Sequence, residues 1–259
     1  MSDKEVMEYD VVVVGGGPAG LSFAIKLKQL SIESNKDISI CIVEKGSEVG
    51  AHILSGAVIE TRALDELIPD WESKGAPLET QAASDKFFLL SEKRAFRMPT
   101  PPQMHNKGNY IISLGNFCRW LAEQAEEIGI DVFAGFSGAD FLIDEQGRVN
   151  GIITGDMGRT KKGEQGTNFE AGIELRAKQT VFAEGCRGSL TKKIFDKFDL
   201  RANCDPQVYG IGIKEVWELD PSKFNRGQIT HTAGWPMDMK TYGGSWMYHY
   251  GENLLSVGF

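Results

Sequence analysis

The chain has 259 residues with 28 basic and 36 acidic side chains, a net charge of −8 at pH 7, and 41% hydrophobic residues. This composition excludes disordered and collagen-like chains and leaves room for one large or two ordinary domains. The acidic balance argues against a nucleic-acid partner. The acidic start at residues 1–10 has neither a signal nor a transit pattern, and no apolar run approaches the roughly 20 residues that a membrane span needs.

The four cysteines, Cys41, Cys118, Cys186 and Cys204, are too far apart for a zinc or iron–sulfur site. We therefore expect four reduced thiols and no metal ligands in this chain.

Residues 9–14 are apolar apart from Asp10, which predicts a buried parallel strand. The glycine-rich segment 15–20 follows it and precedes a predicted helix over 21–30. A G-x-G-x-x-G pattern between a strand and a helix predicts a dinucleotide-binding turn. Gly15 allows the tight turn, Gly17 lets the backbone approach a pyrophosphate, and Gly20 lets helix and strand pack closely.

A second strand over 38–43 ends at Glu44, 24 positions after Gly20. A carboxylate at about this spacing accepts a hydrogen bond from an adenosine ribose and would repel the 2′-phosphate of NADP. The small residues of 46–57 continue with a second glycine-rich turn, whereas a simple NAD domain would proceed to its next helix. The pattern therefore favours FAD over NAD.

Further along the chain, the periodicity predicts a helix over 61–68 and short strands over 87–90 and 95–98, followed by a proline-rich break at 99–102. A helix over 115–128 and a core strand over 130–133 come next. The strands that then follow suggest a β-meander inserted before a closing strand, with the ranges 139–143, 149–154, 173–175 and 180–183 and a polar loop over 155–166.

The turn at 184–189 leads into a predicted helix over 190–198, another arrangement that favours an anion. Beyond residue 203, strand-like segments at 209–218, 227–234 and 245–250 predict an antiparallel layer beside the flavin.

Four longer stretches are more specific than the glycine turn: 50–59, 182–188, 197–215 and, most distinctive, 231–249. With them the chain, from about residue 9 to 259, resembles the electron transfer flavoprotein–ubiquinone oxidoreductase family, part of the p-hydroxybenzoate-hydroxylase-like flavoproteins. The resemblance implies an α/β fold (α+β overall) with a Rossmann-like FAD-binding domain of the p-hydroxybenzoate-hydroxylase/glutathione-reductase type, a β-meander and an antiparallel quinone-binding sheet. It also implies FAD, ubiquinone as acceptor and a [4Fe–4S] cluster whose cysteines belong to a C-terminal part outside this chain.

The resemblance implies no catalytic side chain, because flavin and quinone carry the electrons. It assigns quinone contacts to the Gly243-Gly244 pair, which an ordinary two-glycine hairpin turn would equally explain. We expect the four histidines to be structural or exposed. The residues implied in FAD binding are Gly15, Gly17, Pro18, Ala19, Gly20, Glu44, Lys45, Ser55, Gly56, Val132, Glu184 and Gly185.

The predicted domains are an FAD-binding domain over 1–205, with 86–108 contributing to the second layer, and the start of a quinone-binding domain over 206–259. The predicted function of the complete protein is electron transfer from reduced electron transfer flavoprotein to ubiquinone. We expect peripheral attachment at the cytoplasmic side of the inner membrane. The apolar segment 87–104 with its basic neighbours is the candidate contact surface, and a folded loop over the flavin is the alternative interpretation of the same segment. The alternatives are a flavin reductase or monooxygenase of the geranylgeranyl-reductase-like group, and an inactive truncated FAD module.

Overall fold

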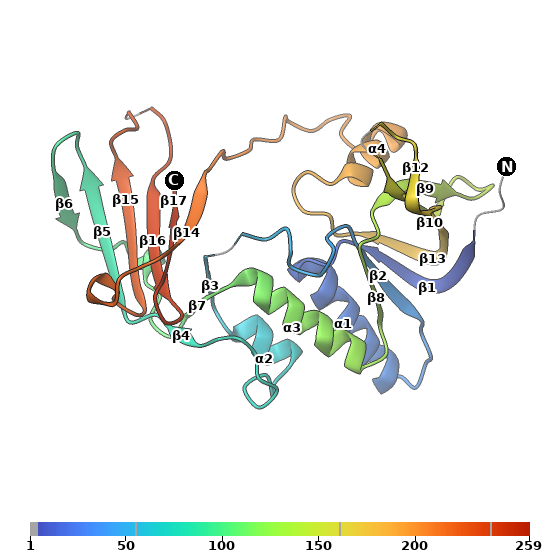
Figure 1. Ribbon diagram of the computed structural model, residues 1–259, viewed down its shortest axis with the longest axis horizontal. Helices are drawn as coiled ribbons and strands as arrows, with labels where there is room; N and C mark the ends of the chain where they lie inside the picture. Colours follow the sequence, from blue (N-terminus) through green and yellow to red (C-terminus); the bar gives the residue numbers. More distant parts are fainter. Residues whose placement is uncertain (1–4, 55, 161, 239) are drawn as a thin grey trace. The chain divides into compact units, whose positions relative to one another are not determined.

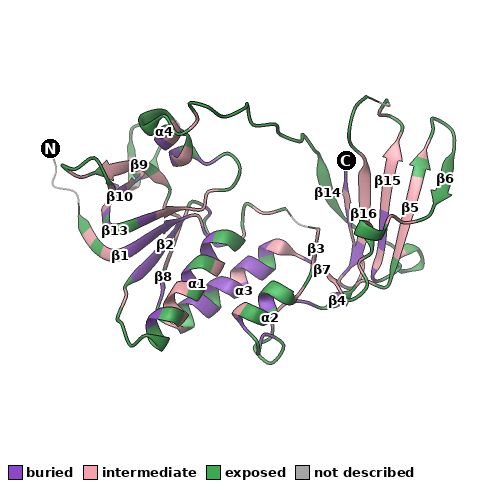
Figure 2. Ribbon diagram, turned by 180° about the vertical axis from the view of Figure 1, so that it is seen from behind, coloured by how far each residue is buried: buried purple, intermediate pink, exposed green. Residues whose placement is uncertain are grey.

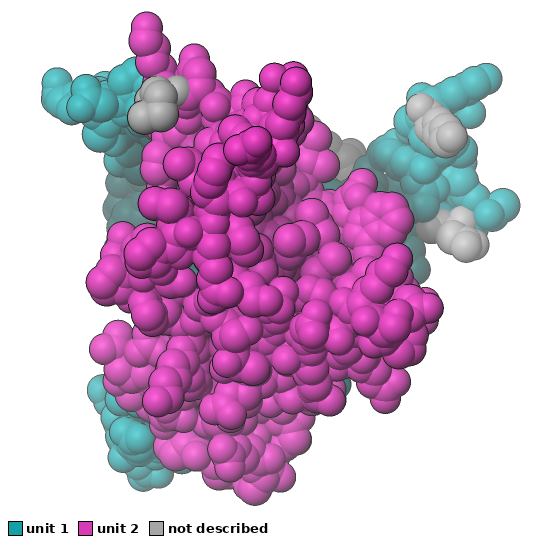
Figure 3. All heavy atoms as spheres, turned by 90° about the vertical axis from the view of Figure 1, so that its left-hand side faces the viewer, with its two compact units in different colours: residues 1–52, 118–206 teal, residues 53–117, 207–259 magenta. Residues whose placement is uncertain are grey.

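The computed structural model describes residues 5–54, 56–160, 162–238 and 240–259. The chain forms two compact units, each built from two separate segments (Figure 3). Unit 1 consists of residues 1–52 and 118–206, and unit 2 of residues 53–117 and 207–259. This division differs from the predicted domain limits in placing the whole of 53–117 with the C-terminal segment.

Unit 1 is built on a six-stranded sheet in the order β8-β2-β1-β13-β10-β9 (Figure 1). Its first four strands are parallel, and β10 and β9 continue the sheet in antiparallel fashion. A parallel βαβ core with an inserted antiparallel hairpin confirms the predicted Rossmann-like class. The strands are β1 (Val6–Val14), β2 (Ile40–Glu44), β8 (Asp131–Ala134), β9 (Gly138–Ile143), β10 (Val149–Thr154) and β13 (Glu174–Phe182).

The core of this sheet is apolar because parallel strands are covered on both faces. Val12, Val14, Cys41 and Val43 are buried together with Leu190 of α4 (Ser189–Phe198). Figure 2 shows β2 and the C-terminal part of β1 as buried. Helix α1 (Pro18–Glu33) joins β1 to β2, and α3 (Leu114–Glu127) precedes β8.

The meander region differs in detail from the sequence prediction. The predicted loop over 155–166 contains β11 (Met157–Arg159) and the first two residues of β12 (Gln165–Glu170), and these two strands pair as a separate two-stranded ribbon. The two predicted strands at 173–175 and 180–183 are one continuous strand, β13. Its middle alternates charged and small residues, so it lacks the apolar run from which a buried strand is recognised.

Unit 2 contains a six-stranded sheet in the order β14-β17-β16-β15-β5-β6 and a small sheet in the order β3-β7-β4. All neighbours in the large sheet are antiparallel except β15 and β5, which are parallel. Its strands are β5 (Ser84–Leu90), β6 (Ala95–Met98), β14 (Lys214–Glu218), β15 (Gln228–Gly234), β16 (Ser245–Tyr250) and β17 (Leu254–Gly258). The small sheet has β3 (Ala57–Ile59), β4 (Thr80–Gln81) and β7 (Tyr110–Ile112). The helix α2 (Arg62–Leu67) and the 3-10 turn η1 (Pro102–Met104) lie in the same stretch of sequence, and the 3-10 turn η2 (Pro221–Lys223) lies between β14 and β15.

The predicted strand over 209–218 is wrong in its first half, because β14 begins only at Lys214. Ile211 is 98% exposed, so this apolar residue has no sheet face to pack on. The core of unit 2 lies where Ile111 of β7, Ile229 of β15 and Tyr250 of β16 meet.

Candidate functional site

The glycine turn of unit 1 lies between the end of β1 and the start of α1, and its glycines have distinct roles. Gly15 has φ +110°, and a Cβ there would overlap the carbonyl oxygen of Ala183. A Cβ on Gly20 would overlap the carbonyl oxygen of Gly15. A Cβ on Gly17 would meet nothing within 4 Å. Two glycines therefore hold the turn together, and the third leaves its backbone open to a ligand.

The first turn of α1 follows this open glycine. Gly17 is the N-cap, Pro18 is the first helical residue, and no side chain caps the helix or adds an acidic group to its first turn. Pro18 and Ala19 are exposed. A 16-residue helix with an uncapped, exposed N-terminus presents N–H groups and a positive dipole end to an anion.

Glu44 lies at the C-terminal end of β2, beside the same turn. Its Oε2 accepts a hydrogen bond from the Gly16 N–H at 2.9 Å, and its Oε1 accepts one from the Gly46 N–H at 2.7 Å. A carboxylate has about four lone-pair sites, so this fixed group retains capacity for hydroxyl donors. The neighbouring Lys45 is exposed.

Val132 is in β8, the edge strand next to β2, where it pairs with Ile42. An edge strand has one row of backbone groups without a strand partner, which is what a backbone contact to an adenine ring requires. The structure therefore places the glycine turn, Glu44 and Val132 on three successive parallel strands of unit 1 or at their ends.

The second predicted anion turn is organised differently. The Glu184 carboxylate accepts hydrogen bonds from the Leu190 N–H at 3.2 Å, the Thr191 N–H at 2.7 Å and the Thr191 hydroxyl at 2.8 Å. This side chain occupies the N-terminus of α4, where we expected an anion. Gly185 has φ +78° and open space around it, so its backbone remains accessible.

In unit 2, Gly56 lies against the large sheet. A Cβ at Gly56 would overlap the Ser256 side chain and lie 3.6 Å from Cδ2 of Tyr248. Its neighbour Ser55, also predicted near the flavin, lies outside the described residues.

The predicted quinone glycines lie in the connection between β15 and β16. A Cβ on Gly244 would overlap the carbonyl oxygen of Thr232, so this glycine is required by the close approach of two chain segments. A Cβ on Gly243 would overlap only the terminal methyl of Met237, a flexible group. Gly243 is exposed, and the neighbouring Tyr242 ring is fully exposed.

Sequence reasoning missed two buried polar atoms of the large sheet. Trp246 Nε1 and Ser256 Oγ are buried, and neither has a hydrogen-bond partner in the part of the chain that the structure describes. The signal that could have found Trp246 is the alternation of residues 245–250, in which every second residue is aromatic and lies on one sheet face.

The cysteines give no sign of reactivity. Burial raises the pKa of Cys41 to about 12 and that of Cys118 to about 11, so both are protonated at neutral pH. Cys186 and Cys204 are exposed and are not part of a disulfide. Over the described ranges, no three His, Cys, Asp or Glu side chains are grouped as a metal site would require.

The fold and the glycine turn define a Rossmann-like dinucleotide-binding protein. A family model described as "Pyridine nucleotide-disulphide oxidoreductase" matches residues 9–193, and the chain belongs to this family. A second family model, "ETF-QO, ubiquinone-binding", matches residues 209–259.

Curated relatives confirm the resemblance predicted from the sequence. The chain is 55% identical over 251 residues to the mitochondrial electron transfer flavoprotein-ubiquinone oxidoreductase of Dictyostelium discoideum. It is 54% identical to the Pseudomonas aeruginosa protein of that name and 53% identical to the Bos taurus one. These alignments cover 97% to 99% of this chain but only 41% to 47% of the relatives. The chain thus spans less than half their length and matches their N-terminal portion.

Solved structures confirm the fold at low sequence identity. A geranylgeranyl bacteriochlorophyll reductase-like protein from Thermoplasma acidophilum aligns over 98% of this chain and 56% of its own, with a TM-score of 0.67 and 20% identity. A flavoprotein/dehydrogenase from Cytophaga hutchinsonii covers 98% of this chain and 55% of its own, with a TM-score of 0.62 and 19% identity.

Proposed function

We propose that this chain is part of an enzyme that takes electrons from reduced electron transfer flavoprotein and passes them through FAD to ubiquinone. The observation that carries the proposal is the ubiquinone-binding family match over 209–259, joined in one chain to a dinucleotide-binding fold. The identity of 53% to 55% to relatives named for this reaction supports it. The [4Fe–4S] cluster belongs to the proposal as a group held by residues outside 1–259.

The residues of unit 1 fit the dinucleotide part of FAD. Gly17 provides backbone without a side chain where a pyrophosphate would approach, and the uncapped first turn of α1 provides N–H groups for its charge. Glu44, held in place by two backbone N–H groups, would accept hydrogen bonds from the ribose, and Val132 would contact the adenine through its backbone. Pro18, Ala19, Gly185 and the backbone of Glu184 complete this proposed contact set, with Lys45, Ser55 and Gly56.

When bound, the flavin supplies one- and two-electron redox chemistry. The protein orients the cofactor, and it keeps groups whose charge would oppose cofactor binding out of the site. Glu44 discriminates against a 2′-phosphorylated nucleotide, because two anionic groups at one site repel each other.

The quinone contacts of this proposal are the Gly243-Gly244 pair, and the structure shows which of the two is the better probe. Gly243→Ala meets only the flexible end of Met237, whereas Gly244→Ala collides with the backbone of β15. In the full-length protein we expect Gly243→Ala to retain FAD and thermal stability while the KM for ubiquinone rises. Unchanged quinone kinetics in Gly243→Ala would contradict the assignment. Absence of ubiquinone reduction by the unaltered protein with reduced electron transfer flavoprotein would contradict the function itself.

Peripheral attachment to the cytoplasmic side of the inner membrane is the second part of the proposal. Within the described ranges, no helix combines the length and apolar composition needed to cross a bilayer. The hairpin of β5 and β6 has exposed apolar side chains on one face, Leu89 at 44%, Phe96 at 49% and Met98 at 41%. Leu89 pairs with Phe96 across the hairpin. The exposed Arg94 immediately precedes β6, and the exposed Arg97 pairs with Phe88 on the opposite face of the hairpin. Apolar groups with basic neighbours suit an anionic bilayer surface.

Liposome flotation tests this surface. Charge reversal at Arg94 and Arg97 should release the protein from vesicles that contain anionic lipid. Charge reversal at Lys192 and Lys197 of α4 is the matched control and should leave binding unchanged. Equal binding of both double variants would exclude the hairpin as the contact.

A further inference from the structure

The large sheet of unit 2 has one face on which polar and aromatic side chains are grouped. Strand register places Asp85 of β5 and Tyr248 of β16 on either side of Ile229, and Trp246 opposite His231. Ser256 of β17 is opposite Tyr248. Side chains of paired residues lie on the same side of a sheet, so we define the inner face by Asp85, Ile229, His231, Trp246, Tyr248 and Ser256.

His231 and Tyr248 form a hydrogen-bonded pair on this face. His231 Nε2 lies 3.0 Å from the Tyr248 hydroxyl, and the two rings meet edge to face with centroids 5.6 Å apart. Burial lowers the pKa of His231, and the charge of Asp85 partly opposes this effect. Burial, assisted by Asp85, raises the pKa of Tyr248 to about 12. At neutral pH the imidazole is therefore neutral and the phenol keeps its proton.

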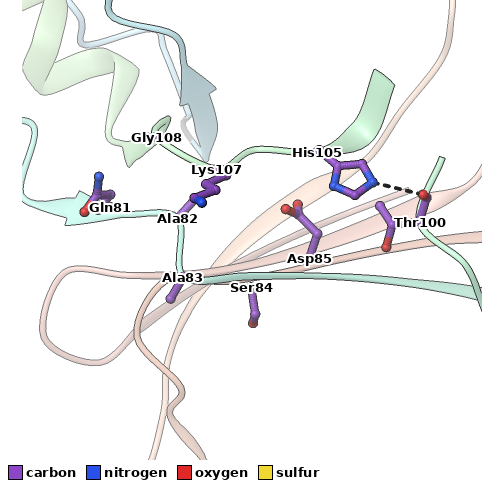
Figure 4. A pocket seen from close by; sticks show the side chains of 9 residues that line it. All are labelled: Gln81, Ala82, Ala83, Ser84, Asp85, Thr100, His105, Lys107 and Gly108. Carbon is purple, nitrogen blue, oxygen red and sulfur yellow. Dashed lines mark hydrogen bonds between the residues drawn. The ribbon is translucent and has the colours of Figure 1, made fainter. Parts of the chain in front are cut away.

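A cavity of about 430 Å³ provides a route from solvent to Asp85. Figure 4 shows the Asp85 carboxylate, the His105 ring and Lys107 on one side of the strand, with Ser84 directed to the other. Asn106 holds Asp85 through its backbone N–H at 3.0 Å and its side-chain Nδ2 at 2.7 Å. The Asp85 carboxylate is thus held in place by Asn106, and Asp85 both lines the cavity and belongs to the inner face.

The two partnerless buried polar atoms lie on the same face. Ser256 Oγ is beside Tyr248 in the sheet register, and the Trp246 ring lies 6.1 Å from the Tyr248 ring. Buried donors and acceptors are normally hydrogen-bonded, so their grouping here points to a ligand with polar atoms. Gly244 lies against Thr232, which follows His231 in β15. The predicted quinone contact is therefore close to the His231 end of the inner face.

We propose that Tyr248 and His231 carry protons from the Asp85 cavity to the quinone oxygens during quinone reduction. This inference rests on the proposed function, which supplies the quinone and, through reduced electron transfer flavoprotein, its two electrons. Reduction to the quinol also requires two protons, and the inner face contains a phenol and an imidazole already joined by a hydrogen bond.

In each proton transfer, the Tyr248 O–H bond breaks as an O–H bond forms on the reduced quinone oxygen. The His231 Nε2–H bond breaks as its proton returns to the Tyr248 oxygen. A hydronium ion from solvent gives a proton to Nδ1 and becomes water, which leaves the ring neutral in its other tautomer. Proton exchange with solvent restores the first tautomer. Two such transfers convert one quinone and two electrons into one quinol.

Several other titratable groups lie near the His231–Tyr248 pair. Asp85 faces it from β5, and His105 and Lys107 line the far side of the cavity. Tyr250 is on the same strand and face, in the core cluster. Strand β7 contributes Ile111 to that cluster, while Tyr110 packs edge to face with Trp71. The negative charge of Asp85 is therefore the one anionic influence that the pKa shifts of both His231 and Tyr248 record.

The test uses the full-length protein with reduced electron transfer flavoprotein and a soluble ubiquinone analogue. Tyr248→Phe should slow quinone reduction about 10²-fold, the usual contribution of a positioned proton donor, while the rate of flavin reduction stays unchanged. The rate that remains in Tyr248→Phe should fall as pH rises, because hydronium ions then supply the proton in place of the phenol. His231→Ala should reduce quinone similarly slowly, and added imidazole should restore the rate. A histidine with a merely structural role would not show this rescue.

His249→Gln is the matched control. His249 is in the same strand as Tyr248, β16, but on the opposite face of the sheet, where it packs against Phe224. It should keep the quinone rate and its pH profile. The relay is overturned if Tyr248→Phe keeps both the rate and the profile of the unaltered protein, or if His249→Gln loses as much. If the unaltered protein reduces its flavin but never ubiquinone, the proposed function fails rather than the relay alone.

Discussion

At the scale of single residues, different glycines of the first turn serve chain packing and ligand binding. Gly15 and Gly20 are needed because neighbouring backbone atoms occupy the space of a side chain, whereas Gly17 faces open space. The motif in the sequence predicts a separate role for each of the three glycines. The structure gives the physical reason, because the space that a Cβ would need is filled at Gly15 and Gly20 and open at Gly17.

This separation predicts contrasting alanine variants. Gly17→Ala should change the free energy of unfolding by less than about 1 kcal/mol, since its φ of −83° suits any residue. It should nevertheless lower the FAD content of the purified protein several-fold. Gly20→Ala should cost roughly 1–3 kcal/mol, as overpacking does. Flavin absorbance per protein and urea unfolding measure the two effects, and full FAD content in Gly17→Ala would exclude a close pyrophosphate there.

At the scale of elements, α4 shows how a sequence pattern can mislead. A small-residue turn before a helix predicts an anion site, but the carboxylate of Glu184 reaches the first turn of α4 and takes its N–H groups. The capping residue precedes Leu190 by six positions, which lies outside the spacing of ordinary N-cap motifs. Local sequence rules therefore could not have identified it.

Removing this cap should destabilise unit 1 without emptying the cofactor site. Glu184→Ala should lower the free energy of unfolding by about 1–2 kcal/mol, as loss of a helix cap does, and Glu184→Gln by less. Glu145→Gln, in the exposed turn before β10, is the control and should have no effect. Urea denaturation measures the changes. A stable Glu184→Ala protein that has lost its FAD would instead assign this side chain to the cofactor.

The prediction of elements succeeded where periodicity was strong and failed where it was weak. Strands β1 and β2 and helix α3 follow from apolar patterns that burial on a sheet requires. β3, β4 and β7 have two or three residues each and carry no period that could identify them. The glycine turn and Glu44 could be placed from spacing alone, whereas the His231–Tyr248 pair depends on cross-strand register, which sequence does not reveal. The assignment of cofactor contacts and of domain limits stays a prediction.

At the scale of the whole molecule, charge and burial set different pH limits for the two units. His231 and His249 of unit 2 both have their pKa lowered by burial. In unit 1, hydrogen bonds from Lys178 and Ser39 lower the pKa of Asp10 to about 2. The stabilisation that the Asp10 carboxylate contributes is fully present above its unfolded pKa of about 4, and it is lost only as the pH falls toward 2.

Unit 2 should therefore lose stability at a milder pH than unit 1. A histidine with a lowered folded pKa takes up protons more readily when unfolded, so stability is complete above about pH 6.5 and declines below it. Each histidine can contribute up to about 1.4 kcal/mol per pH unit within this window. Thermal unfolding between pH 5 and 7.5 should show the decline, and His231→Gln should flatten it. An identical slope in that variant would contradict the assignment.

The parallel pairing of β5 with β15 has a consequence for how the protein is made. These strands are about 140 residues apart in sequence, yet they are central neighbours in one sheet. At typical synthesis rates of about 5–20 residues per second, β5 and β6 leave the ribosome on the order of ten seconds before their partner exists. During that interval an apolar hairpin has an unpaired edge, which is the condition that favours aggregation. Productive folding of unit 2 should thus depend on chaperones that shield this nascent hairpin, even though the finished sheet needs no assistance.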